Sequence, residues 1–384
     1  MTTNKSALSM IEKYPIPWSD QKIIDFRRKL LEWYDQHQRM LPWRLTDDPY
    51  KIWVSEIMLQ QTQVETVKPY YERFISTLPD VETLAQASEE ELMTLWQGLG
   101  YYSRVRNMQT AAQQILELFN GVFPQDKEGL MTLKGIGPYT SGAIASIAFG
   151  KAEPAIDGNL TRIVTRLFDI EEDIHLSKTK KKIEAYVYQL IDRDRPGDFN
   201  QALMDMGATI MTASNPYPHE HPLQEFDLSY QNGTSQERPV KKKKIKASHH
   251  QMLAYVISNR QGQYLMRKHQ ETELLTGLWH YPIVEVDLVM EGATTLEIIE
   301  PLIQHYGNLL SQKDWESVTI KTSIHEGEHQ EEIKHIFSHR VWHIKKVCVE
   351  VEVTDIEDST DVKWVSLENL EELPVSTLQK KLMV

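Results

Sequence analysis

The sequence predicts two domains, a helical N-terminal domain and a smaller C-terminal α/β domain. Between residues 20 and 223 apolar residues recur at three- and four-residue spacing, and Gly and Pro interrupt them at short intervals, as in a globule of many helices. After residue 248 the runs QMLAYVISNRQGQYLMRKH and VWHIKKVCVEVEV have strand texture, and LEIIEPLIQHYG between them has helical spacing. We therefore place the domains at 1–227 and 248–384, joined by a polar linker at 228–247 that ends in a lysine run.

The composition is that of a globular protein and excludes several classes. Of the 384 residues, 41% are hydrophobic and 25% are charged, which suits two domains with separate cores. No run of about 18 apolar residues occurs, so we expect no membrane partner. The single cysteine, Cys348, excludes an internal disulfide and a metal cage of several cysteines. The N-terminal residues lack the features of a secretory signal or transit peptide, and we expect a cytoplasmic protein.

The net charge argues against a nucleic-acid partner. It is −13 for the whole chain, and the first 225 residues carry 24 Lys and Arg against 31 Asp and Glu. A positive field that attracts DNA over long range is therefore absent. Any contact with DNA must come from local geometry.

The run LKGIGPYTSGAIASIAFG predicts a helical hairpin. Gly135 and Gly137 allow a tight turn, and Pro138 suits the first turn of the next helix. That helix carries small residues around Gly142, which permit the close approach of a neighbouring segment. The amides at its start can hold a DNA phosphate in spite of the acidic chain. An ordinary helical hairpin remains the alternative for this pattern taken alone.

Two carboxylates are candidates for catalysis. Glu56 has Ile52 one turn before it and Leu59 one turn after it, so it lies on the apolar stripe of a predicted helix. Burial there raises the pKa of a carboxyl group toward the range of a general acid, whereas a buried ion pair is the structural alternative. Asp157 in AIDGN suits either the N-cap of a helix that starts near Leu160 or a carboxylate in a cleft, and its position alone leaves both open.

Five motifs together resemble the adenine DNA glycosylase family (MutY) of the helix-hairpin-helix superfamily, over residues 21–227. They are LPWR (41–44), WVSEIMLQQTQV (53–64), GLGYYSRVRN (98–107), LKGIGPYTSGAI (133–144) and AIDGN (155–159). The resemblance implies a helix-hairpin-helix glycosylase domain that binds double-stranded DNA and removes adenine paired opposite 8-oxoguanine or guanine. It also implies base flipping, because a base within the duplex stack cannot reach the enzyme.

The same resemblance implies roles for the catalytic residues. Glu56 would protonate N7 of the extruded adenine, and Asp157 would stabilise the oxocarbenium-like sugar, a two-carboxylate arrangement similar to that of glycoside hydrolases. Tyr139 and Asn159 would orient these groups. Tyr139 also occupies the position of the catalytic lysine in enzymes similar to endonuclease III, so Schiff-base chemistry lacks its amine and a monofunctional enzyme is expected.

The resemblance further implies a set of substrate- and DNA-binding positions. Gln61, Leu99 and Tyr101 match the wedge that fills the gap beside the opposite purine, with core packing as the alternative for Leu99. Gln201 replaces a glutamate that relatives often carry near the adenine edge. The full set is Trp43, Arg44, Gln61, Thr62, Leu99, Tyr101, Gly135, Gly137, Gln201, Phe337, Ser338 and His339.

The C-terminal domain resembles Nudix (MutT-like) hydrolases without their catalytic acids. TGLWHYP, residues 276–282, is similar to the GLWEFPGG stretch of that family, but no GX₅EX₇REUXEEXGU box follows to bind magnesium. We therefore expect a recognition domain on a hydrolase-like fold. Phe337, Ser338 and His339 match the loop by which members of the adenine glycosylase family read 8-oxoguanine.

The stretch MTASNPYPHEHPLQEFD departs from the family pattern. Most members carry four cysteines there around a [4Fe–4S] cluster; the aligned positions in this chain are Met211, Pro218, His221 and Asp227. We expect no cluster, no required cofactor and a loop held by prolines and packing alone. A zinc site is a weaker alternative, because its candidate ligands are crowded and lack two-pair spacing; they are His219, Glu220, His221, Glu225 and Asp227.

Other functions and partners stay open at this point. A glycosylase for another base, a lesion-sensing DNA-binding protein without catalysis, and a nucleotide hydrolase are the alternatives. The resemblance allows a monovalent cation held by the hairpin carbonyls of Leu133 and Ile136. We expect a monomer in the bacterial cytoplasm, associated with the nucleoid.

Overall fold

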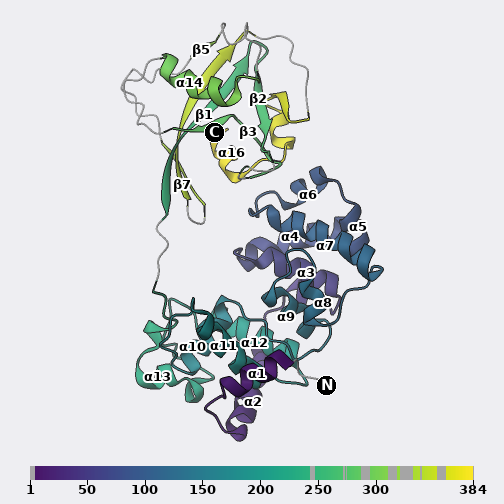
Figure 1. Cartoon of the computed structure of the whole chain (residues 1–384), viewed down its shortest axis with the longest axis vertical. Helices are drawn as coiled ribbons and strands as arrows, with labels where there is room; N and C mark the ends of the chain where they lie inside the picture. The colour runs from purple at the N-terminus through teal and green to yellow at the C-terminus, as the bar shows by residue number, and fades with distance from the viewer. Residues whose placement is uncertain are drawn as a thin grey trace. The chain divides into compact units, whose positions relative to one another are not determined.

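The computed structural model describes residues 5–242, 247–270, 273, 275–286, 295–309, 318–320, 332–337, 340–352 and 360–383. The chain folds into two compact units, Met1–Ala87 with Arg106–Lys244 and Ser88–Val105 with Ile245–Val384. Figure 1 shows the helices of the first unit in purple to teal and the sheet of the second in green to yellow. No helix in the described ranges is long and apolar enough to cross a bilayer.

The N-terminal 240 residues are helical, as expected from the spacing of their apolar residues. In chain order the helices are α1 (Lys5–Lys13), α2 (Asp20–His37), η1 (Pro42–Arg44), α3 (Pro49–Leu59), α4 (Val64–Thr77), α5 (Val81–Gln86), α6 (Glu89–Trp96), α7 (Ser103–Phe119), α8 (Lys127–Met131), α9 (Pro138–Ile147), α10 (Gly158–Leu167), α11 (Ser177–Leu190), α12 (Pro196–Thr209), η2 (Gln224–Phe226), α13 (Leu228–Asn232) and η3 (Ser235–Glu237). A large apolar core joins α2, α10, α11 and α12.

Glycines set how closely the helices of the first unit approach one another. A Cβ on Gly142 of α9 would lie 2.1 Å from the carbonyl oxygen of Pro154. A Cβ on Gly207 of α12 would lie 2.7 Å from the Cβ of Asn159 in α10. The small-residue pattern of α9 therefore serves the close approach that the sequence suggested, and Gly207 brings α12 against the start of α10.

The segment expected to be a linker is partly structured. Residues 228–242 include α13 and η3, and Ser229, Ser235 and Arg238 are buried. Arg238 pairs with Asp169 at 2.7 Å, so the buried charge is matched. The linker predicted at 228–247 is therefore folded from residue 228 to about residue 238, with buried polar groups that have partners, whereas Lys241 and Lys242 of the lysine run are exposed.

The second unit contains a mixed sheet with apolar side chains on both faces. Its described strands are β1 (Ser248–Asn259), β2 (Gln263–Lys268), β3 (Trp279–His280), β4 (Ile283–Glu285), β5 (Thr319–Ile320), β6 (Ile333–Ile336), β7 (Arg340–Val351) and β8 (Val362–Ser366), followed by η4 (Asn369–Glu372). The path runs β3-β2-β1-β7-β5, with β1 and β7 parallel from the pair Ser248–Arg340 to the pair Asn259–Val351. α14 (Thr295–Tyr306) covers one face and α16 (Thr377–Leu382) the other.

We expect the substitution Gly142→Ala to destabilise the first unit, because its new methyl group overlaps the Pro154 carbonyl. The free energy of unfolding should fall by about 1–3 kcal/mol, the usual effect of overpacking. The matched control is Gly137→Ala, since Gly137 has φ −95° and no atom within 4 Å of an added Cβ. Urea unfolding of both variants measures the effect, and equal stabilities would contradict the packing role of Gly142.

Candidate active site

The side chain of Glu56 lies in a helix that is buried on all sides. Asp48 caps α3, its carboxylate accepting a hydrogen bond from the amide of Tyr50 at 2.9 Å, and Pro49 starts the first turn. Every residue from Ile52 to Met58 is buried. The sequence predicted one apolar stripe on this helix, but the structure buries all of its faces between Ile52 and Met58. Glu56 is only 6% exposed.

Burial makes Glu56 a weak acid. Desolvation raises the pKa of Glu56 from its ordinary 4.5 to about 7, and the nearby charge of Asp157 adds to the increase. Tyr139 of α9 donates its phenolic hydrogen to Oε2 of Glu56 and opposes the shift. Burial and the charge of Glu56 raise the pKa of Tyr139, which therefore stays a donor at neutral pH. Glu56 holds its proton in a considerable fraction of molecules at neutral pH.

Asp157 caps helix α10 and also lines a cavity, so both roles that the sequence left open for it are present in the structure. Its Oδ1 accepts the amide of Leu160 at 2.7 Å, and its Oδ2 accepts the side-chain amide of Asn159 at 2.9 Å. Burial raises the pKa of Asp157, while these donors and the charge of Arg162 favour its ionised form. Arg162 donates to Oδ1 of Asn159 at 2.8 Å and thereby fixes the amide that holds Asp157.

A cavity of about 590 Å³ brings the two carboxyl groups together. Nine of the residues predicted for the site line it: Trp43, Arg44, Glu56, Gln61, Thr62, Tyr139, Asp157, Asn159 and Gln201. Its volume falls within the range of small-molecule sites in proteins. Met204 of α12 also lines it and lies 3.9 Å from the Tyr139 hydroxyl through its sulfur.

Sequence reasoning missed the carboxylate that fixes Arg44. Asp205 of α12 is buried and accepts hydrogen bonds from Arg44 Nη2 at 2.7 Å and from Arg39 Nε at 2.7 Å. Burial alone would raise the pKa of Asp205, but the two guanidinium groups outweigh it and lower the pKa. The ion pair with Arg44 therefore belongs to Asp205, and Glu56 keeps its hydrogen bond to Tyr139. The sequence held one sign of this buried carboxylate: Asp205 is the single acidic residue in the mostly apolar run FNQALMDMG.

The hairpin before α9 has an exposed glycine and leads into a helix without a side-chain cap. Gly135 has φ +78° and packs against Asn107, where an added Cβ would lie 2.8 Å from the Asn107 Cβ. Gly137 supplies no side-chain cap to the first turn of α9. The side chains of Leu133 and Ile136 are buried, while Gly135 is exposed. The hairpin is thus anchored by its apolar residues and presents its backbone to solvent, a suitable site for a phosphate.

Two of the predicted wedge residues have unusual backbone conformations. Gln61 follows α3 with φ 57°, and Tyr101 precedes α7 with φ 49° and is 46% exposed. Left-handed backbone is unfavourable for side chains other than Gly, and it concentrates at functional sites. Leu99 is buried, so its alternative as a packing residue fits the structure.

Phe337 is half-buried at the end of β6 in the second unit. Its ring packs edge-on against Trp342 at 4.8 Å and against His335 at 4.7 Å, and its amide donates to the carbonyl of Arg340 at 2.8 Å. Ser338 and His339 lie outside the described residues.

The loop from residue 211 to 227 does not fit a [4Fe–4S] cluster. No aligned position offers a thiolate, and all four are buried. The amide of Leu223 donates to His221 Nδ1 at 3.3 Å, so His221 Nε2 carries the proton and donates to Asp227 Oδ2 at 3.0 Å. Asp227 Oδ1 also accepts from Ser229 Oγ at 2.8 Å. This hydrogen-bond network corrects the expectation that packing alone holds the loop.

The alternative zinc site is also not formed in this loop. His219, Glu220 and Glu225 are exposed, whereas His221 and Asp227 are buried and bonded to each other. The five side chains therefore do not share one coordination site. The loop is instead tied to the cavity, because Arg162 Nε donates to the carbonyl of Met211 at 2.8 Å.

Comparisons with known proteins match both units. The family model of the HhH-GPD superfamily base excision DNA repair protein matches residues 54–192, and the NUDIX domain model matches residues 253–384. The adenine DNA glycosylase of Rattus norvegicus is 32% identical over 411 residues, covering 93% of this chain and 77% of the rat protein. That of Arabidopsis thaliana is 34% identical over 385 residues, covering 90% of this chain but 59% of the plant protein.

A solved structure supports the helical fold. The structure of a thermostable thymine-DNA glycosylase superimposes with a TM-score of 0.51 at 25% identity, covering 56% of this chain and 98% of that one. The helix-hairpin-helix architecture and the Nudix-like second domain predicted from the sequence are thus confirmed.

We predict that Glu56 destabilises the fold as pH rises. Between pH 4.5 and about 7 the folded chain keeps a proton on Glu56 that the unfolded chain has lost, so the free energy of unfolding falls across this interval. Glu56→Gln removes this titration. Since one pKa unit corresponds to about 1.4 kcal/mol, its stability relative to the parent should increase by about 3 kcal/mol toward alkaline pH. Urea unfolding at acidic and alkaline pH measures the difference, and a pH-independent difference would exclude the raised pKa.

We predict that Asp227→Ala destabilises the loop by about 3 kcal/mol or more, because it leaves the buried ring N–H of His221 without an acceptor and removes the side-chain cap from the amide of Tyr230. Glu225→Ala is the matched control. Its carboxylate is exposed and pairs only with Lys29 at the surface, so a loss below about 1 kcal/mol is expected. Thermal unfolding and limited proteolysis compare the two variants. Similar losses would show that the buried network does not hold the loop.

Proposed function

The chain belongs to the adenine DNA glycosylase family, and we propose that it is a monofunctional glycosylase that removes adenine paired opposite 8-oxoguanine in DNA. One observation carries the proposal: Glu56, hydrogen-bonded by Tyr139, and Asp157, held by Asn159, line the same cavity. A protonated acid and an ionised carboxylate on one cavity suit the hydrolysis of an N-glycosidic bond.

In the proposed reaction Glu56 gives its proton to N7 of an adenine flipped into the cavity. The C1′–N9 bond then breaks, and its electron pair leaves with the base while positive charge develops on the sugar. Asp157 stabilises that charge, and water adds to C1′ to leave an abasic site. The proton released by the water restores the acid form of Glu56. A pKa of about 7 suits both transfers, because a general acid works best when its pKa lies near the working pH.

The lining of the cavity supports hydrolysis by water over attack by an amine. No lysine is among the cavity-lining residues in the part of the chain that the structure describes. Tyr139, where a Schiff-base enzyme carries its nucleophilic lysine, is committed to Glu56 by its hydroxyl. An amine that could form a covalent imine and then cleave the strand is therefore missing from the site.

The opposite base is the second part of the proposal. Gln61 and Tyr101, with their left-handed backbone, would occupy the gap left by the flipped adenine, and the open amides near Gly137 would hold a phosphate. The stretch from Phe337 to His339 would read 8-oxoguanine at the edge where the lesion carries an N7–H donor and an O8 acceptor. Thymine is the rival target base, given the likeness to a thymine-DNA glycosylase.

The proposed enzyme requires no iron–sulfur cluster. Cys348 is the single cysteine of the sequence, and it lies in the C-terminal half. The positions that hold the cluster in most family members are filled here by the His221–Asp227 hydrogen bond and its surroundings. These residues maintain the geometry between the loop and Arg162.

Single-turnover cleavage tests the function. Duplexes with one 8-oxoG:A, G:A or G:T pair are incubated with the parent and with Glu56→Gln, and products are read before and after alkali, alongside an iron assay of the protein. We expect adenine loss that needs alkali for strand scission, fastest opposite 8-oxoguanine, without iron. Glu56→Gln should slow it by about 10²–10⁴-fold. The parent rate should decline as pH rises through about 7, since the acid loses its proton.

The matched control is Glu65→Gln, an exposed carboxylate whose loss should leave the rate unchanged. Scission without alkali would contradict monofunctional hydrolysis. Preferential release of thymine would replace adenine as the target. Tight duplex binding without loss of any base would make the protein a lesion sensor.

A further inference from the structure

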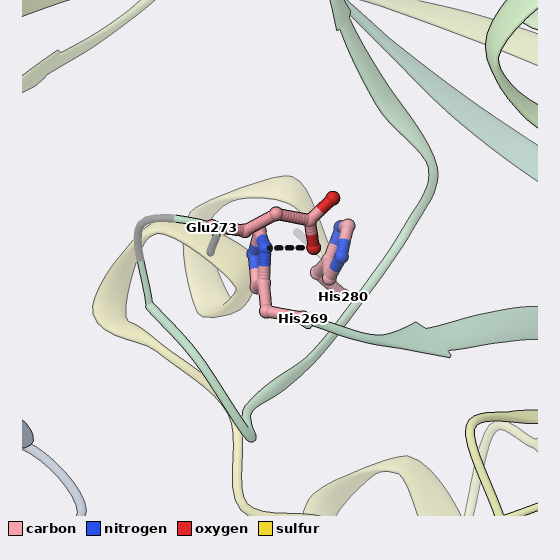
Figure 2. A group of neighbouring side chains, drawn as sticks. All are labelled: His269, Glu273 and His280. Atoms are coloured by element: carbon pink, nitrogen blue, oxygen red, sulfur yellow. Dashed lines mark ion pairs between the residues drawn. The ribbon is translucent and has the colours of Figure 1, made fainter. Parts of the chain in front are cut away.

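Three side chains of the second unit converge on one point where β2 meets β3. They are His269 directly after β2, His280 in β3 and Glu273 in the loop between them (Figure 2). Each offers a ligand atom, and these atoms lie within 4.8 Å of one another. The two imidazole rings are stacked with centroids 3.5 Å apart and an interplanar angle of 17°. Neither the glycosylase reaction nor the reading of a lesion uses these residues.

The backbone fixes this arrangement. The amide of His269 donates to the carbonyl of Leu278 at 2.9 Å, and the amide of Gly277 donates back to the carbonyl of His269 at 2.8 Å. The amide of Gln270 donates to Oε2 of Glu273 at 2.7 Å and turns its carboxylate inward. These hydrogen bonds join the two ends of the β2–β3 connection and fix the positions of the three side chains.

The hydrogen bonds leave the imidazoles in a form that binds metal. His280 Nδ1 lies 2.5 Å from the carbonyl oxygen of Tyr281 and must donate to it, so Nε2 is the unprotonated nitrogen and faces Arg267 Nη1 at 3.5 Å. Metal-binding histidines are commonly oriented by this type of bond to a carbonyl. His269 Nδ1 is buried and pairs with Oε2 of Glu273 at 3.5 Å, the long limit of a hydrogen bond. A metal ion would satisfy this buried nitrogen better than so long a contact does.

The chemistry of the three side chains suits zinc. Two imidazoles and a carboxylate form a donor set that Zn²⁺ prefers.

The guanidinium of Arg267 contacts two of the three groups that would bind a metal ion. Its Nη1 lies 2.8 Å from Oε2 of Glu273 and 3.5 Å from Nε2 of His280. Its guanidinium also lies 5.0 Å from the centre of the Tyr306 ring. A metal ion and the guanidinium compete for the same two acceptors, and Arg267 can keep its contact with Tyr306 when it gives them up. Arg267 therefore lowers the affinity of the site without removing any ligand.

We infer that His269, Glu273 and His280 form a zinc site that secures the β2–β3 loop of the second unit. Zinc with bonds of roughly 2.1 Å holds tetrahedral ligands about 3.4 Å apart, so the side chains close in slightly around it and solvent supplies the fourth ligand. The rival position for a metal is the pair of exposed His249 and partly buried His343, whose nitrogens lie 2.8 Å apart, with Glu332 beside His343.

Metal titration of the full chain tests the inference without DNA, so its result is separate from that of the glycosylase assay. The protein is stripped with a chelator and titrated with Zn²⁺ in competition with a chromophoric chelator. We expect one Zn²⁺ per chain. Glu273→Gln should weaken binding at least about tenfold, and Arg267→Gln should strengthen it. Co²⁺ in place of zinc should give the absorption of a tetrahedral site with nitrogen and oxygen ligands.

The control His343→Gln removes the rival pair and should leave the affinity unchanged. His280→Gln should abolish zinc binding. If the buried substitution His280→Gln prevents folding, Arg267→Gln still tests the inference, because it is the variant expected to bind zinc more tightly. The inference is overturned if zinc binds only at millimolar concentration, if Glu273→Gln and Arg267→Gln leave its affinity unchanged, or if His343→Gln abolishes it.

Discussion

The burial of one carboxyl group is the constraint on which the site depends. Glu56 sits in a helix without a solvent face, where an ionised carboxylate is unfavourable by several kcal/mol. The fold tolerates the residue because Tyr139 gives it a hydrogen bond and because it can hold its own proton. The same burial that destabilises the chain at high pH creates the acid of the proposed reaction, so stability and the proposed catalysis are opposed at this residue.

Helix α12 lines the cavity and fixes several of the residues around it. Asp205 fixes Arg44 and Arg39, Gly207 allows Asn159 to pack against the helix, and the carbonyls of Gly207 and Met211 at its end accept hydrogen bonds from Arg162. Arg162 in turn holds Asn159, which holds Asp157. The orientation of Asp157 is therefore linked, through three hydrogen bonds, to the beginning of the loop at Met211. A loop that lost its fold would release Arg162 and with it the amide of Asn159 that hydrogen-bonds Asp157.

Motifs with fixed spacing allowed the two carboxylates, the hairpin and the strand pattern to be predicted, because local sequence determines them. The partners across the cavity escaped prediction. Asp205 is distant in sequence from Arg44, and only the packing of α12 brings the two together. Arg162 is near Asp157 in sequence, but it holds Asp157 indirectly, through Asn159 on the same helix, and no motif indicates that contact. The segment 228–238 was misjudged for a related reason. A polar side chain is expected to be exposed to solvent only if the fold offers it no buried partner. Arg238 is buried because it forms an ion pair with Asp169.

The acidity of the chain and its proposed DNA partner are compatible because the groups suited to hold DNA are not charged side chains. Backbone amides at the start of α9 carry partial positive charge whatever the net charge of −13. Such amides act only at short range, so they cannot draw the duplex from a distance as a basic surface does. Affinity must then come from close fit: a phosphate at the hairpin, a wedge with its backbone already strained at Gln61, and a base inside the cavity. In the proposed mode of binding, undamaged DNA would add little affinity, because none of its bases would enter the cavity. The largest gain would come from the mispair whose adenine leaves the stack at the lowest free energy.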